Sequence, residues 1–175
     1  MTYIAFLRGI NVGGNHKVPM ADLRNIMTDL GYENVKTILN SGNVVFDCRQ
    51  TNLPTIEATL EAQLSEAFGF PIPVILRTKN EITDLVRDNP FEKIEMHSDL
   101  RLYVSFLKTE PNVSISVPYI SDDSSFQILE VRNCDVVSML DLSKGKTVNG
   151  MNDLEKLFGK NITTRNWNTI IKVLQ

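Results

Sequence analysis

Residues 3–19 read YIAFLRGINVGGNHKVP, and the rest of the chain is organised around this stretch. The apolar run Tyr3–Leu7 predicts a strand that is buried on both faces. A loop with three glycines follows, and Pro19 suits the first position of a helix. Because anions often bind where a helix begins after a strand, this loop is the first candidate for a functional site.

The rest of the first half predicts an alternation of helices and strands. Gly31 and Gly69 are helix-stop signals, and Asn40–Asn43 has the composition of a hairpin turn. Pro73 lacks an N–H donor, so its strand is expected at the edge of a sheet. The expected elements are a helix over 19–30, strands over 35–39 and 44–47, a helix over 54–68 and a strand over 72–76. Together with the first strand, this is the order of a ferredoxin-like (split βαβ) fold.

The second half predicts a variant of the same order. Its expected elements are a short helix through Ile82 to Val86, strands over 102–106, 125–132 and 136–140, and helices over 151–158 and 167–174. Residues 109–121 fit a helix or an irregular segment equally well. A helix is expected in place of the last strand. We therefore expect an α+β protein of two packed ferredoxin-like subdomains, residues 1–78 and 79–175, that form one compact unit.

Composition narrows the class of protein. The chain has 175 residues, is 42% hydrophobic and has a formal net charge of −3, so it is globular and lacks the basic excess of a non-specific nucleic-acid binder. Cys48 and Cys134 predict free thiols rather than a disulfide framework. The sequence contains no zinc-ligand spacing, and no cofactor is expected. Without a signal peptide or an apolar run of membrane-spanning length, the expected location is the cytoplasm, and the oligomeric state is left open.

Several segments resemble the bacterial domain of unknown function 1697 family. They are YIAFLRGINVGGNHKV at 3–18, followed by Pro19-Met20, NSGNVVF at 40–46, NPF at 89–91 and TTRNWNT at 163–169. The resemblance implies an α+β architecture of two packed ferredoxin-like subdomains, and it implies little about activity. One segment departs from the family, whose members carry Ser-Lys-Leu-Thr where this chain has Thr147–Gly150. If the lysine of that family segment has a role, this chain must supply it from Lys146 or has lost it.

The glycine-rich loop is the leading candidate for a ligand site. Its glycines permit backbone angles at which consecutive N–H groups turn inward as an anion-binding nest. Arg8 is suited to bidentate contact with an oxyanion, and Lys17 adds charge. The alternative is a solvated loop that needs glycine for a sharp reversal. The candidate ligand-binding residues are Arg8, Gly9, Asn11, Gly13, Gly14, Lys17, Ser41, Asn43, Arg165 and Asn166.

Two of these candidates lie in the segment Thr163–Thr169. Either Thr164 or Asn166 is expected to cap the last helix, which explains most of the segment without a ligand. The alternative is that Arg165 and Asn168 are polar contacts of a cleft. Arg165 would then face the same acidic ligand as the loop arginine.

Three functions compete. The leading one is a non-enzymatic protein that binds a small phosphate- or carboxylate-bearing ligand at the loop, between the subdomains. The second is a hydrolase or transferase that uses the loop as an oxyanion site with His16 or Ser41; no nucleophile–base pair is evident, so no catalytic residue is assigned. The third is binding of RNA or single-stranded DNA, which needs exposed aromatic residues. Tyr3, Phe6 and Phe46 lie in predicted strands, but core packing explains them more simply.

Overall fold

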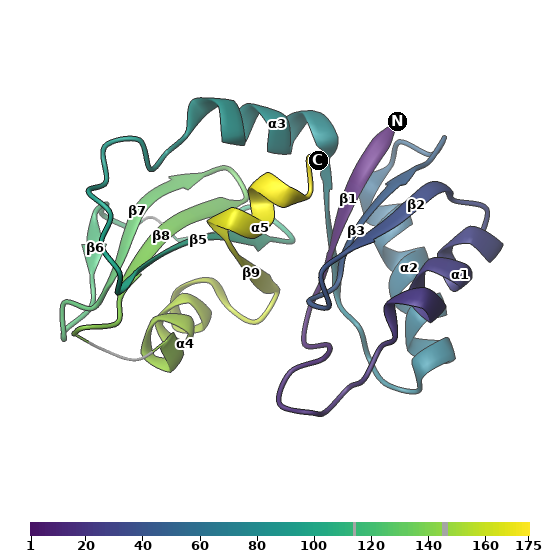
Figure 1. The fold of residues 1–175 in the computed structure, drawn as a ribbon, viewed down its shortest axis with the longest axis horizontal. Coiled ribbons are helices and arrows are strands. Elements are labelled where there is room, and N and C mark those ends of the chain that lie inside the picture. Colours follow the sequence, from purple (N-terminus) through teal and green to yellow (C-terminus); the bar gives the residue numbers. More distant parts are fainter. Residues whose placement is uncertain (114, 145–146) are drawn as a thin grey trace. The chain divides into compact units, whose positions relative to one another are not determined.

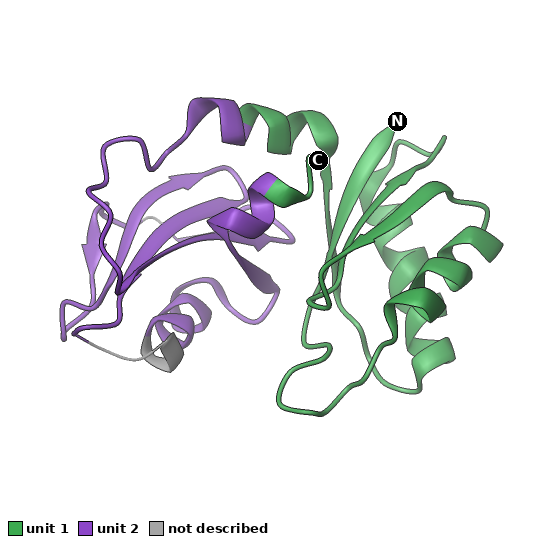
Figure 2. Cartoon of the chain, in the orientation of Figure 1, with its two compact units in different colours: residues 1–84, 172–175 green, residues 85–171 purple. Residues whose placement is uncertain are grey.

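The computed structural model describes residues 1–113, 115–144 and 150–175, and the backbone of residues 147–149. It divides the chain into two compact units (Figure 2). Unit 1 contains residues 1–84 and 172–175, and unit 2 contains residues 85–171. Each unit combines an antiparallel sheet with helices (Figure 1), so the chain is an α+β protein, as the sequence predicts.

Unit 1 has the ferredoxin-like order of elements. They are β1 (Thr2–Leu7), α1 (Met20–Asp29), β2 (Glu33–Ile38), β3 (Asn43–Asp47), α2 (Leu53–Phe68) and β4 (Val74–Thr78). The strands form one antiparallel sheet in the order β2-β3-β1-β4. β1 is a central strand, and its residues 3–7 are buried, as predicted. β4 lies at the edge of the sheet, where the missing N–H of Pro73 predicts it.

The core of unit 1 follows from the alternation of side chains along β1. Tyr3, Ala5 and Leu7 point into this core. Ala5 pairs with Val44 on β3 and with Leu76 on β4. α1 and α2 cover this face of the sheet (Figure 1). The buried core residues of these helices are Leu23, Met27, Ile56, Leu60 and Leu64. The glycine-rich loop therefore begins at the end of a central, buried strand.

The helices of unit 1 begin and end at residues that favour such positions. Pro19 is the N-cap residue of α1, with φ −62° and ψ 130°, and not its first helical residue. Asn52 caps α2, because its Oδ1 accepts a hydrogen bond from the N–H of Thr55 at 3.0 Å. Gly69 ends α2 in the left-handed conformation, with φ 78°. Proline and asparagine therefore mark where these helices begin, and glycine marks where α2 ends.

Unit 2 is built on a five-stranded antiparallel sheet in the order β6-β7-β8-β5-β9. Its elements are β5 (Leu100–Leu107), β6 (Tyr119–Ile120), β7 (Phe126–Arg132), β8 (Asp135–Asp141), α4 (Thr147–Phe158) and β9 (Ile162–Asn166). The divisions between the units fall within α3 (Lys79–Asp88) and α5 (Trp167–Lys172). α4 packs on one face of the sheet. The core on that face consists of Leu107, Phe126, Ile128, Val136, Leu140, Leu154 and Ile162.

The structure corrects one prediction for unit 2. The sequence predicts no strand between the helices over 151–158 and 167–174, and a helix was expected in place of the last strand of the fold. The strand β9 lies between these helices, at residues 162–166. β9 pairs with β5, and Thr164 Oγ1 lies 2.7 Å from Ser105 Oγ across the pair. The β-branched residues Ile162–Thr164 favour a strand, but the polar side chains conceal that signal. The described residues of 109–121 are irregular apart from β6, so no helix is described in the connection between β5 and β7. This missing helix makes unit 2 a variant of the ferredoxin-like fold.

Candidate functional site

The glycine-rich loop, residues 8–18, folds as a small hairpin. The N–H of Asn11 donates to His16 O at 3.0 Å. Between them, Gly13 and Gly14 have φ values of 59° and 80°. The two-residue turn of a tight hairpin requires consecutive positive φ values, and glycine adopts them without steric cost. The two glycines therefore have a conformational role in the loop.

The side chain of Asn11 fastens the loop to the neighbouring β2–β3 turn. Its Nδ2 donates to Asn40 O at 2.8 Å and to Val18 O at 3.0 Å, and its Oδ1 accepts from the N–H of Val18 at 2.9 Å. Asn11 has φ 55°, a conformation that asparagine tolerates better than most residues. One side chain therefore closes the loop on itself and ties it to the turn.

Gly42 lets the β2–β3 turn approach the base of the loop. A Cβ atom at Gly42 would lie 2.7 Å from Ile10 Cδ1 and 2.8 Å from Leu7 Cβ. Gly42 O accepts a hydrogen bond from the N–H of Leu7 at 2.8 Å. Asn43 is fully buried, and its Nδ2 donates to Ser41 Oγ at 3.0 Å. Ser41 and Asn43 are therefore neighbours in sequence of Asn40 and Gly42, the residues that contact the loop and its base.

The loop carries positive charge and available donors on its exposed side. Residues 8–19 include two basic side chains, Arg8 and Lys17, and no aspartate or glutamate. Arg8 is partly buried, whereas Gly13, Gly14 and Lys17 are exposed. Within the described part of the chain, the N–H groups of Gly13 and Gly14 and the ammonium of Lys17 have no protein partner. An anion would therefore meet donors and positive charge here without a competing carboxylate from the loop.

His16 and Ser41, the two residues of the enzyme alternative, contact neighbouring parts of unit 1. The His16 ring stacks on the Phe70 ring at a centroid distance of 4.4 Å, and its Nδ1 lies 3.2 Å from Gly9 O. Ser41 Oγ accepts the hydrogen bond from Asn43 Nδ2. These contacts give both residues a structural role, and a catalytic role stays a prediction.

Arg165 and Asn166 lie on β9 in unit 2. Arg165 is buried, and its Nη1 donates to Thr163 Oγ1 at 2.8 Å and to Thr164 O at 2.9 Å. Burial lowers the pKa of Arg165 to about 10, so the guanidinium is still charged at neutral pH. Asn166 Oδ1 accepts from the N–H of Asn168 at 3.0 Å, so Asn166 is the residue that caps α5. A ligand shared by Arg165 and Arg8 stays a prediction.

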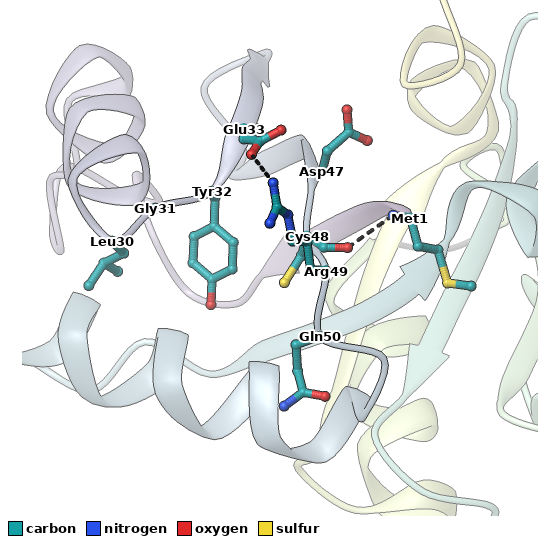
Figure 3. A pocket seen from close by; sticks show the side chains of 9 residues that line it. All are labelled: Met1, Leu30, Gly31, Tyr32, Glu33, Asp47, Cys48, Arg49 and Gln50. Carbon is teal, nitrogen blue, oxygen red and sulfur yellow. Dashed lines mark hydrogen bonds and ion pairs between the residues drawn. The ribbon is translucent and has the colours of Figure 1, made fainter.

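A hollow of about 450 Å³ lies at the opposite end of β1 from the loop (Figure 3). Tyr32 and Cys48 line it, and at its edge the Met1 ammonium donates to Cys48 O at 2.9 Å. Burial, and then the Cys48 thiol, raises the pKa of the Tyr32 hydroxyl. Glu33 Oε1 and Arg49 Nη2, also at the hollow, lie 3.9 Å apart. Because the charged groups here have both signs, the hollow has no preference for an anion, and no sequence motif pointed to it.

Three further observations concern aromatic residues, cysteines and possible metal ligands. Tyr3, Phe6 and Phe46 are fully buried, so they are not available to stack on nucleic-acid bases. Cys48 and Cys134 are free thiols, as predicted. Among the residues that the structure describes, no group of three or more His, Cys, Asp or Glu side chains is placed to hold a metal ion.

Two points concern the chain as a whole. Across the described segments, none of the helices has both the length and the apolar composition that a membrane span requires. Lys146, the residue that would replace the family lysine, lies outside the described residues.

Comparison with known proteins gives a family and a fold. The family model described as "Protein of unknown function (DUF1697)" matches residues 1–125. A solved structure from Streptococcus pneumoniae, described as that of a conserved bacterial protein, is similar to this chain, with a TM-score of 0.75 and 24% sequence identity. The similarity covers 99% of this chain and 97% of that chain, and at this identity it supports the fold alone. No curated protein matches the sequence.

Proposed function

This chain belongs to the DUF1697 family of proteins of unknown function, and we propose that its unit 1 binds a small anionic ligand at the glycine-rich loop. The ligand carries a phosphate or a carboxylate group, and the role is binding without catalysis. One observation carries the proposal: residues 8–19 combine two basic side chains, exposed amide donors and no carboxylate on one hairpin.

Electrostatics supports an anion at this position. The whole chain has a formal net charge of −3, yet the loop is locally positive. The amide groups of Gly13 and Gly14 supply hydrogen bonds, and the ammonium of Lys17 supplies a charge that gains about 1 kcal/mol from a nearby unit charge in water. Arg8 at the base of the loop adds a planar guanidinium, whose geometry matches a phosphate or carboxylate.

The rigidity of the loop also supports binding. A flexible loop would lose conformational entropy when it orders around a ligand, and a loop that is already ordered avoids this cost. Here the Asn11 side chain holds the loop through Val18 and Asn40, and stacking on Phe70 holds His16. The donors are therefore held in place before a ligand arrives.

Thermal unfolding in the presence of anions tests the proposal. The probes are sodium phosphate, adenosine monophosphate, glucose 6-phosphate and acetyl phosphate, each compared with sodium chloride at the same ionic strength. A ligand at one hundred times its Kd stabilises the folded state by about 2.7 kcal/mol, so a saturable rise in Tm is expected with at least one probe. No rise with any probe would overturn the proposal.

Matched lysine variants locate the site. Lys17→Gln removes a charge from the loop, and Lys36→Gln makes the same change at an exposed position on β2. The stabilising anion is expected to bind more weakly to Lys17→Gln and with unchanged affinity to Lys36→Gln. Equal weakening in the two variants would mean that the anion responds to overall charge and not to the loop.

A further inference from the structure

A second hollow, of about 330 Å³, lies in unit 2 between residues 96–102 and residues 166–168. The antiparallel pairing of β5 with β9, in which Tyr103 lies opposite Asn166, brings these two segments together. We propose that this hollow binds a small organic carboxylate with an apolar body. The site is separate from the loop in unit 1, and its ligand is of a narrower chemical class.

Arg101 supplies the charge for the carboxylate. Its Nη1 donates to Ser98 O at 2.7 Å and to Leu100 O at 3.0 Å, and these two bonds fix the guanidinium at the hollow. Within the described residues, its Nε and Nη2 have no partner, and no aspartate or glutamate lines the hollow. A guanidinium held this way presents its remaining N–H groups as a fork, which is the geometry that a carboxylate accepts.

Two asparagine side chains add polar contacts. Asn166 Oδ1 is occupied by the N–H of Asn168, which fixes the Asn166 amide and leaves its Nδ2 without a partner among the described residues. Asn168 is exposed at the hollow, and its side-chain amide has no partner in the same part of the chain. α5 has only six residues, so its dipole contributes little and Arg101 is the main source of positive charge.

Apolar side chains also line the hollow. Trp167, Leu100 and Leu102 line the hollow and are almost completely buried, so their positions are fixed by packing. The Trp167 ring meets the Phe91 ring edge-to-face at a centroid distance of 5.1 Å, which holds the indole in place. Met96 also lines the hollow and is 57% exposed, so it lies at the rim. The hollow therefore combines apolar and polar lining residues, which suits a ligand with an apolar body and one charged group.

His97 does not supply a second free charge. Its Nε2 lies 3.9 Å from Asp141 Oδ2, and Asp141 is also paired with Lys144 at 3.3 Å. One arginine without a carboxylate partner balances a ligand that carries a single negative charge, such as a carboxylate. A phosphate dianion would leave an excess negative charge, because the hollow offers no second unpaired cation among its described lining residues.

Tryptophan fluorescence reads this site directly, because Trp167 is the only tryptophan in the chain. The probes are phenylacetate, its uncharged isostere phenylacetamide, and inorganic phosphate at the same ionic strength. Phenylacetate is expected to change Trp167 emission saturably and to bind at least about tenfold more tightly than phenylacetamide. Equal binding of the amide, stronger binding of phosphate, or no saturable change with phenylacetate would overturn the proposal.

Three variants complete the test. Arg101→Gln is expected to weaken phenylacetate binding at least about tenfold, whereas Arg49→Gln, at a guanidinium that is 97% exposed in unit 1, is expected to leave it unchanged. Because Arg101 also contacts backbone carbonyls, Met96→Glu provides a second variant that places a carboxylate on the rim without touching the packing. It is expected to weaken phenylacetate and to leave phenylacetamide unchanged. Unchanged phenylacetate affinity in both site variants would overturn the proposal.

Discussion

Asn11 Nδ2 and Asn40 O lie 2.8 Å apart, and this hydrogen bond joins the glycine-rich loop to the β2–β3 turn. The two residues belong to segments that are far apart in sequence and adjacent in unit 1. The same Asn11 amide also bonds both polar groups of the Val18 backbone. Asn11 therefore organises the loop from within, and its removal is the most direct way to loosen the proposed site.

Asn11→Ala is expected to destabilise unit 1 by about 1–2 kcal/mol, because three hydrogen bonds are lost and an alanine must adopt a positive φ. Partial exposure of the site keeps the cost low, since water replaces some of these bonds. Urea unfolding measures the change, and faster hydrogen exchange of the Val18 amide locates it. Asn15→Ala, at an exposed position of the same loop, is the matched control and should cost much less. Equal costs for the two variants would contradict the role assigned to Asn11.

Gly42→Ala is expected to cost about 2–4 kcal/mol, because the new methyl group meets Ile10 and Leu7 and the residue has a positive φ. Gly69→Ala separates these two causes. Gly69 has φ 78°, close to the 75° of Gly42, but no atom lies within 4 Å of the position of its Cβ. Gly69→Ala should therefore destabilise the protein by only about 1 kcal/mol. Urea unfolding of the two variants measures the difference, and equal costs would show that the contact with the loop is loose.

Sequence reasoning located most elements of unit 1 because strong local signals mark their ends. Gly31 and Gly69 stop helices, and a glycine at position 42 marks the hairpin between β2 and β3. The turn at Asn133 in unit 2 was found in the same way, and Asn133 has φ 48°. Signals of this kind depend on only a few neighbouring residues, so they can be recognised without the tertiary structure.

β9 was missed because its side chains do not alternate between apolar and polar residues. Arg165 is only 8% exposed. A hydrophobicity pattern instead predicts that an arginine lies at the surface. What decides the strand is the pairing with β5, which satisfies the backbone and covers the polar side chains. That pairing is a long-range contact, and no local pattern carries it.

The candidate site was predicted only in part for the same reason. The composition of the loop is unusual enough to be found in the sequence, but its contact with Asn40 and Gly42 depends on the register in which Phe6 lies opposite Asn43. The hollow in unit 2 depends likewise on the pairing of Tyr103 with Asn166. Arg101 is not among the predicted site residues, since nothing next to it in sequence shows that it lacks a carboxylate partner.

Ser138→Ala is expected to leave stability unchanged or to raise it by about 1 kcal/mol. Ser138 is fully buried on β8, and within the described residues its Oγ has no hydrogen-bond partner. Folding therefore removes this hydroxyl from water without a compensating hydrogen bond, which lowers the free energy of unfolding. Ser105→Ala is the matched control. Ser105 is also fully buried, but its Oγ is hydrogen-bonded to Thr164 Oγ1, so its loss should destabilise unit 2. Urea unfolding compares the two, and a large loss for Ser138→Ala would reveal a bond that the structure lacks.

The acid dependence of stability is expected to involve Asp47. Hydrogen bonds from the Thr2 hydroxyl and from the Asn34 amide lower the pKa of the Asp47 carboxyl below its usual range. The carboxyl therefore binds a proton more weakly in the folded chain than in the unfolded chain. Its contribution to stability is present above the unfolded pKa of about 4 and is lost as the pH falls through the lower folded value.

Asp47→Asn should therefore destabilise the protein at neutral pH, and the difference from the wild type should shrink below about pH 4. Thr2→Val removes the larger of the two causes and should reproduce part of this change. Urea unfolding of the three proteins between neutral pH and about pH 3 measures the effect. Parallel pH profiles for all three would mean that Asp47 titrates alike in the folded and unfolded chains, and that its hydrogen bonds to Thr2 and Asn34 carry no pH-dependent stability.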